Sequence, residues 1–196
     1  MTTTQMTTDA AGVPTVGPIL IELDAQAWAE QLDATVAWFD NLLMIQATFR
    51  DMAADTAGKI REPHIKKYIT DIAEAARGHE EKARELYQAI GREPAQSGVR
   101  TLGGTLLSKV SQVVADLQGA AGGAVGNWGD IRQLLLTNLD SMGAFGVAEQ
   151  LGLALGLPAI VDITFPILNE KSTQQLLLQE YMLEMAPKSI LYKASI

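Results

Sequence analysis

Apolar residues recur at alternating spacings of four and three residues through four long segments of this chain. This spacing lines one face of an α-helix, because a helix turns once every 3.6 residues. The first segment covers residues 24–57, and Asp24 is a suitable N-cap. Its face is predicted to consist of Trp28, Leu32, Thr35, Phe39, Leu42, Gln46, Phe49 and Ala53. Leu43, Met44 and Ile45 lie off this face, so the helix is expected to be apolar on more than one side.

The second segment is predicted to run from Pro63, which suits a first helical turn, to Ile90, which Gly91 follows as a C-terminal stop. Its inward face is predicted to consist of Ile65, Ile69, Ile72, Ala76, His79, Ala83, Leu86 and Ile90. Its charged residues are predicted to face solvent, namely Lys66, Lys67, Glu80, Glu81, Arg84 and Glu85.

Two further helices are predicted at 130–155 and 158–186. Asp130 is expected to cap the earlier one, in which Gly143 and Gly146 predict close contact with another helix. The later one is predicted to bend at Pro166 and to end before Pro187. Its inward face is predicted to consist of Ile160, Ile163, Ile167, Glu170, Gln174, Leu177, Tyr181 and Glu184.

Residues 92–129 differ in composition from the rest, being rich in Gly, Ser, Ala and Val. Leu106, Val110, Val113 and Leu117 predict one short amphipathic helix there, before a glycine-rich run at 119–126 that is unfavourable for regular helix. A connection of this length can carry the chain from one end of a bundle to the other. The predicted fold is therefore all-α: a four-helix bundle over 23–186, with a long crossover at 92–129 that carries an extra short helix. Residues 1–22 and 187–196 are predicted tails.

Composition limits the possible partners. With 196 residues the chain fits a single domain. The net charge of −8 and the scattered basic residues argue against a nucleic-acid partner, which requires clustered Lys and Arg. Since 47% of residues are hydrophobic and only 19% charged, we expect apolar surface to remain for self-association.

The predicted location is the cytoplasm. The chain has no cysteine, which excludes disulfides, iron–sulfur clusters and thiol catalysis. Its first residues lack the pattern of a signal peptide. The longest apolar stretch, 142–160, is interrupted by Glu149, Gln150 and Pro158, so a membrane-spanning helix is not expected.

Polar residues interrupt all four predicted inward faces at about mid-height: Gln46, His79, Asn138, Glu170 and Gln174. Buried polar groups must be paired, and Gln and Asn side chains form neutral hydrogen bonds well but are poor iron ligands. A polar network is therefore the leading interpretation. A weak metal site at His79 and Glu170, for iron or manganese, is the alternative.

Three stretches resemble helices of the YciE/YciF-type ferritin-like stress proteins of bacteria. They are Arg77-Gly-His-Glu-Glu-Lys-Ala-Arg-Glu-Leu-Tyr-Gln-Ala-Ile-Gly91, Ala148-Glu-Gln-Leu-Gly152 and Leu168-Asn-Glu-Lys-Ser-Thr173. The resemblance covers roughly residues 24 to 186 and implies a ferritin-like bundle that dimerises. It also implies a two-metal site of Glu, His and Asp residues.

The resemblance maps His79 and Glu170 onto ligand positions of that family, but other acids are missing. The expected carboxylates fall on or near Leu42, Ala75, Thr137 and Gln174. The chain also has no Glu-x-x-His, the motif with which iron-binding bundles of this type build half of their site. Glu74 and Asp140 lie close in sequence to two of these positions. The sequence therefore predicts a degenerate di-iron site.

The predicted function is that of a non-catalytic structural or assembly protein, which associates with itself through apolar helix faces and its tails. The alternative is a divergent stress protein that uses His79, Glu170 and Glu74 to handle iron or peroxide. A third interpretation places the crossover on a membrane surface, but few basic residues support it. No nucleophile elbow or phosphate-binding loop is recognisable, and no reaction is predicted.

Overall fold

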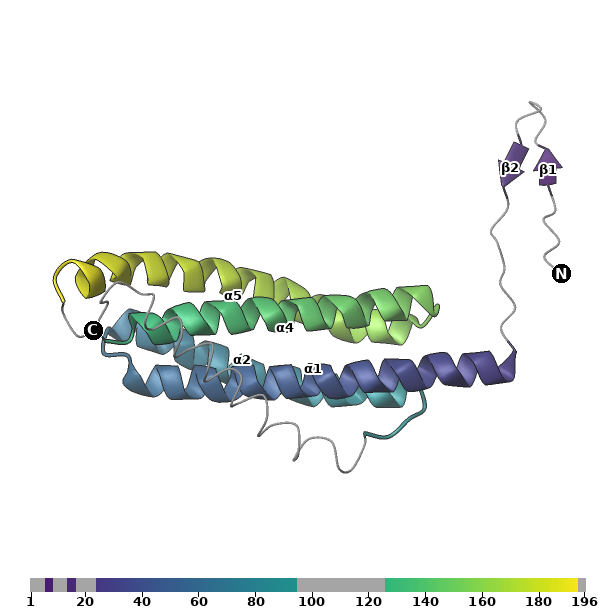
Figure 1. The fold of residues 1–196 in the computed structure, drawn as a ribbon, viewed down its shortest axis with the longest axis horizontal. Coiled ribbons are helices and arrows are strands. Elements are labelled where there is room, and N and C mark those ends of the chain that lie inside the picture. The colour runs from purple at the N-terminus through teal and green to yellow at the C-terminus, as the bar shows by residue number, and fades with distance from the viewer. Residues whose placement is uncertain (1–5, 9–13, 17–23, 95–125, 194–196) are drawn as a thin grey trace. The chain divides into compact units, whose positions relative to one another are not determined.

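A computed structural model of the chain describes residues 6–8, 14–16, 24–94 and 126–193. These residues form two short strands and four long helices, as Figure 1 shows. The elements are β1 (Met6–Thr8), β2 (Pro14–Val16), α1 (Ala25–Lys59), α2 (Pro63–Ala89), α4 (Trp128–Ala154) and α5 (Pro158–Ile190). None of the described helices is both long and apolar enough to cross a membrane.

The chain divides into two compact units, Met1–Asp33 and Ala34–Ile196. In the first unit β1 pairs with β2 in antiparallel register, with Met6 opposite Val16 and Thr7 opposite Thr15. The residue pattern predicts no element here, although β-branched Thr and Val favour extended backbone. Asp24 caps α1 as predicted, because its Oδ1 accepts the amide of Ala27 at 2.7 Å.

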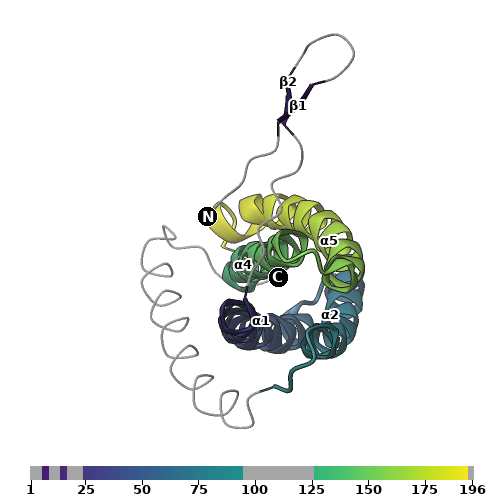
Figure 2. The ribbon, with the colours of Figure 1, turned by 90° about the vertical axis from the view of Figure 1, so that its right-hand side faces the viewer.

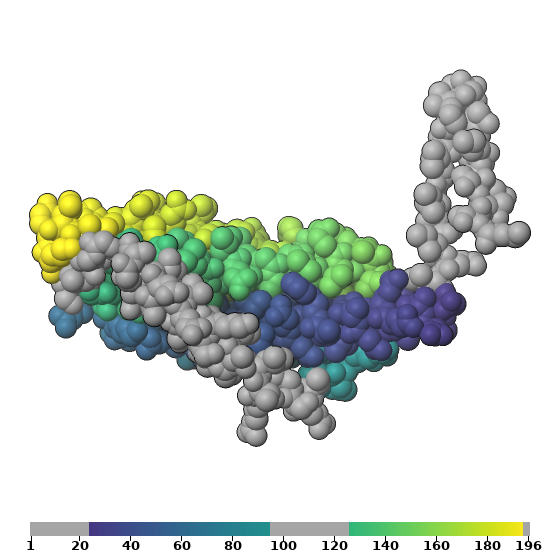
Figure 3. Space-filling view, viewed as in Figure 1, coloured from purple at the N-terminus to yellow at the C-terminus, as the bar shows by residue number. Residues whose placement is uncertain are grey.

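The second unit is an all-α four-helix bundle, as predicted. The end-on view in Figure 2 shows α1, α2, α5 and α4 following one another around a common centre. Figure 3 shows α5 beside α4, with α1 along the other side of α4. At one end, the Nδ2 of Asn127 donates to the carbonyl of Lys59 at 2.7 Å, and the Lys59 ammonium lies 3.0 Å from Asp130. These contacts join the end of α1 to the start of α4.

The core confirms the predicted faces of α1 and α2. Every residue predicted on the α1 face from Leu32 onward is buried, and Trp28 is partly buried. All eight residues predicted on the α2 face are buried as well. One large apolar cluster joins all four helices, with Phe49, Ile69, Leu134 and Leu178 among its fully buried members. Each such side chain contributes roughly 1.5–3 kcal/mol to folding.

Helix ends differ from prediction at two places. α4 begins at Trp128, so Asp130 lies within its first turn and Asn127 occupies the N-cap position. α5 continues through Pro187 to Ile190, because Met185 and Ser189 are buried and hold this last turn against the bundle. The predicted C-terminal tail therefore begins as helix. The predicted crossover helix lies at 95–125, outside the described residues.

The buried face of α5 is one residue away from the predicted one over much of its length. Thr164, Lys171, Leu178 and Met185 are buried, whereas Glu170 and Glu184 are exposed. This rotation keeps two carboxylates in solvent, where their charges are hydrated. Ile160, Ile167 and Gln174 are buried as predicted.

Two smaller predictions are also wrong. Glu80 is buried rather than solvated, because it accepts hydrogen bonds from Arg50 and Arg84. Gly143 does not mark a close helix contact, since a Cβ atom placed on it would meet nothing within 4 Å. The close approach is at Gly152, where an added Cβ would lie 2.7 Å from the Cβ of Ile160.

Candidate functional site

His79 of α2 and Glu170 of α5 meet at mid-height of the bundle, with 2.9 Å between Nε2 and Oε2. The imidazole is 5% exposed, whereas the side chain of Glu170 is half exposed. Burial lowers the pKa of His79, and the hydrogen bond to Glu170 opposes that effect. The neutral ring then donates its Nε2 proton to the carboxylate, a tautomer inferred from this contact. Its Nδ1 is buried and has no hydrogen-bond partner within the described ranges.

The other predicted mid-bundle residues form hydrogen bonds with nearby groups. Gln174 donates to Oε1 of Glu170 at 3.2 Å, which places it with the His79–Glu170 pair. Gln46 donates to the carbonyl of Ala76 at 2.8 Å and accepts from Ser141 at 2.7 Å, linking α1 to α2 and α4. These bonds tie the helices together at a level where the core is polar.

Asn138 of α4 belongs to a second contact, made with α5. Its Nδ2 donates to the carbonyl of Lys171 at 3.1 Å and to Oε1 of Gln175 at 2.8 Å. In the described residues, no hydrogen bond joins this group to Gln46 or to His79. The polar residues are thus distributed over three separate groups of hydrogen bonds.

Lys171 is a buried ionisable residue that sequence reasoning did not assign to the core. Its side chain is fully buried, and its Nζ lies 3.9 Å from the ring centroid of Phe49 and 5.9 Å from that of Phe145. Among the described residues Nζ has no hydrogen-bond partner, and burial lowers the pKa of this amine to about 7. The available signal was its spacing, four residues after Ile167 and seven before Leu178, which places the three residues on one helix face.

These residues do not fit a two-metal centre. In the ranges 24–94 and 126–193, no group of three or more His, Asp or Glu side chains converges. Glu74 is exposed on α2, and Asp140 lines a different groove, so neither joins His79 and Glu170. The charge of Lys171 lowers the pKa of His79, whereas the carboxylate of Glu170 raises it.

A cleft between α2 and α5 opens beside the His79–Glu170 pair. Its volume is about 360 Å³, and its polar lining includes Tyr68, Asp71, Glu170 and Gln174. Burial and the nearby carboxylates raise the pKa of Tyr68 to about 12, so this phenol stays neutral. Asp71 is already engaged by Lys67 at 2.7 Å.

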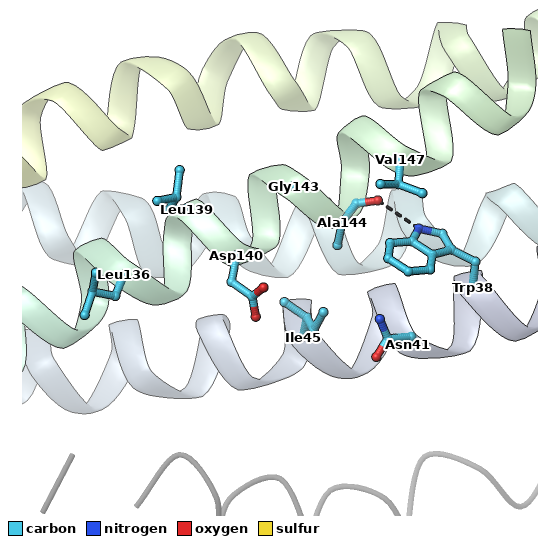
Figure 4. A pocket seen from close by; sticks show the side chains of 9 residues that line it. All are labelled: Trp38, Asn41, Ile45, Leu136, Leu139, Asp140, Gly143, Ala144 and Val147. Atoms are coloured by element: carbon cyan, nitrogen blue, oxygen red, sulfur yellow. Dashed lines mark hydrogen bonds between the residues drawn. The ribbon is translucent and has the colours of Figure 1, made fainter. Parts of the chain in front are cut away.

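A larger, mainly apolar groove of about 480 Å³ lies between α1 and α4, as Figure 4 shows. The indole Nε1 of Trp38 crosses this gap and donates to the carbonyl of Ala144 at 3.0 Å. The α4 wall consists of Leu136, Leu139, Asp140, Gly143, Ala144 and Val147. Its three large apolar residues, Leu136, Leu139 and Val147, are all more than one-third exposed, so the groove presents apolar surface to solvent.

Exposed large apolar side chains are confined to one half of the described bundle. They lie on α4, on α5 and on the two residues after α5, whereas α1 and α2 have none. The set is Leu136, Leu139, Val147, Leu153, Phe165, Leu176, Leu183, Ile190, Leu191 and Tyr192. Exposed apolar side chains gathered on one part of a surface mark an interaction site more often than single scattered ones do.

Comparison with known proteins supports the fold only. No protein-family model matches the sequence, and no curated protein matches it either. Among solved structures, the fold is similar to that of a protein from Xanthomonas campestris pv. campestris, with a TM-score of 0.63 and 13% sequence identity. The match covers 83% of this chain and 98% of the other. At that identity the likeness concerns the fold, and the chain is a four-helix all-α protein without a family assignment.

Proposed function

We propose that this chain is a structural or assembly protein of ferritin-like type, which associates with copies of itself through apolar helix faces and its tails. The single observation that carries the proposal is the confinement of exposed large apolar residues to α4, α5 and the residues after α5. Burying them between copies is favourable by about 25 cal/mol per Å² of apolar area. The order of two helices, a long connection and two more helices supports the ferritin-like assignment.

The charge distribution favours the same conclusion. A net charge of −8 makes two copies repel one another at long range, so they can meet closely only through faces that carry few charges. The exposed charged residues of α2, such as Lys67, Glu81 and Lys82, make its outer side a solvated surface. The sparsely charged outer surface of α5 is better suited to contact between copies.

The test is the molar mass in solution, measured by light scattering after size exclusion. Two paired variants add charge to the apolar faces: Leu139→Glu with Val147→Glu on α4, and Leu176→Glu with Leu183→Glu on α5. A matched control, Ala54→Glu with Gln88→Glu, adds the same charge at exposed positions of α1 and α2. We expect an oligomer in the wild type and the control, and a smaller species in at least one face variant. A monomeric wild-type chain would refute self-association.

The tails are tested separately by deleting residues 1–18. If this tail docks on a neighbouring copy, the truncated chain should form a smaller assembly at equal concentration. An unchanged mass would reject tail docking and leave the helix faces as the means of association.

One alternative function has a specific observation in its favour. The 2.9 Å contact between His79 and Glu170 could supply two ligands to a single divalent metal, in a divergent stress protein that handles iron or peroxide. The metal content of protein purified without chelators tests this, with His79→Ala and Glu170→Ala as variants. Near-stoichiometric iron or manganese that both variants lose would favour the metal function over the assembly function.

A further inference from the structure

The outer side of α5 carries a second row of residues at alternating spacings of four and three. The row comprises Phe165, Asn169, Ser172, Leu176, Gln179, Leu183, Ala186 and Ile190. Ala186 is partly buried and the other seven are exposed, so this seam faces solvent. Apolar residues at such spacing form the surface by which one helix packs along another, and five of the eight positions here are apolar.

The seam carries no charge. None of its eight residues is ionisable, and of the eight flanking heptad positions only Glu180 is charged. The other flanking residues are Pro166, Leu168, Thr173, Gln175, Met182, Pro187 and Ser189. For a chain of net charge −8, an uncharged strip along most of a 33-residue helix is a place where an identical copy meets little repulsion.

We propose that two copies of this chain pair through their α5 helices, parallel and in register, along this seam. The inference rests on the proposed self-association and names the surface and the partner. Phe165, Leu176, Leu183 and Ile190 would each pack against the same residue of the second copy. Their side chains would thereby be removed from water.

The polar residues of the seam determine the direction. In a parallel pair, Asn169 faces Asn169 and Gln179 faces Gln179 of the other copy, and each amide can both donate and accept. If the two seams were instead aligned over their full length in opposite directions, Gln179 of one copy would face Leu176 of the other, and Asn169 would face Ala186. Burying an amide without a partner costs about 1–3 kcal/mol, so the parallel register is favoured.

The absence of cysteine from the chain makes disulfide mapping clean. Ser172→Cys and Leu183→Cys are made singly and together, and Lys67→Cys on α2, whose side chain is 77% exposed, is the control. After mild oxidation, covalent dimers are measured on non-reducing gels. Only cysteines with Cα atoms within about 7 Å of each other are joined efficiently.

Parallel pairing predicts that each single seam variant forms covalent dimers rapidly, while Lys67→Cys does so slowly. Crosslinking of the double variant alone would show the antiparallel arrangement and overturn the proposed register. Equal rates in all variants would indicate random collision and overturn the pairing.

Solution mass separates this proposal from the more general one. Leu176→Glu combined with Leu183→Glu should weaken the dimer by about 100-fold or more in Kd, because two apolar layers are lost. An oligomer that persists in this variant and fails to crosslink at Ser172→Cys or Leu183→Cys would refute the α5 seam while leaving self-association intact. A monomeric wild-type chain would refute both.

Discussion

Replacing Lys171 with methionine should change how the stability of this protein depends on pH. The amine is fully buried, lies over the ring of Phe49 and has no hydrogen-bond partner in the part of the chain that the structure describes. Burial lowers its pKa from 10.5 to about 7. Between these pH values the unfolded chain holds a proton on the amine and the folded chain does not, so folding becomes more favourable as the pH rises.

The size of the effect follows from the width of that window. Each pH unit inside it changes the free energy of unfolding by about 1.4 kcal/mol. Between pH 7 and 10.5 the free energy of unfolding therefore rises by about 5 kcal/mol in total, and between pH 7.5 and 9.5 it rises by about 3 kcal/mol. Methionine has a similar length and no charge, so Lys171→Met should remove this dependence and be more stable than wild type at pH 7.5.

The assay is urea denaturation at pH 7.5 and 9.5, at one fixed protein concentration so that association does not alter the comparison. Lys67→Met is the matched control. Lys67 is exposed, and Asp71 raises its pKa. Its deprotonation can therefore lower the stability only at a pH above the two used in the assay. The free energy of unfolding of wild type and control should rise by about 3 kcal/mol more than that of Lys171→Met. Parallel pH dependences in all three proteins would refute the argument that Lys171 is buried with a lowered pKa.

Two further predictions concern single sites. Gly152→Ala should lower the free energy of unfolding by roughly 1–3 kcal/mol, because the new Cβ would overlap Ile160. Gly143→Ala should leave it unchanged or raise it by up to about 1 kcal/mol, because its Cβ would meet no neighbour within 4 Å in the described residues. Denaturant titration measures both effects. Equal effects would contradict the contact at Gly152. Because the pKa of His79 is lowered in the folded chain, the unfolded chain takes up a proton first as the pH falls below 6.5. The free energy of unfolding should therefore decrease as the pH falls. His79→Gln should lose less of its free energy of unfolding between pH 7 and 5 than the wild type does. Identical acid titrations of wild type and variant would show that His79 is not buried neutral.

Local spacing was sufficient to predict the inner faces of α1 and α2. On these helices the apolar residues form a dominant row, and polar alternatives such as Lys66 and Arg77 lie on the other side. His79 could be assigned to the core for the same reason. On α5 two neighbouring rows both contain apolar residues, so the spacing alone could not decide between Glu170 and Lys171.

The sequence by itself determined the fold class, the number of long helices and the absence of cysteine chemistry, because these depend on periodicity and composition along the chain. Only the tertiary structure decided that Lys171 is buried, since Phe49 and Phe145 come from α1 and α4. It also decided that Gly152 is the close-contact glycine, because Ile160 reaches it only after the turn between α4 and α5. The rotation of a helix about its own axis is set by what its neighbours bring to it, and that is information no single segment contains.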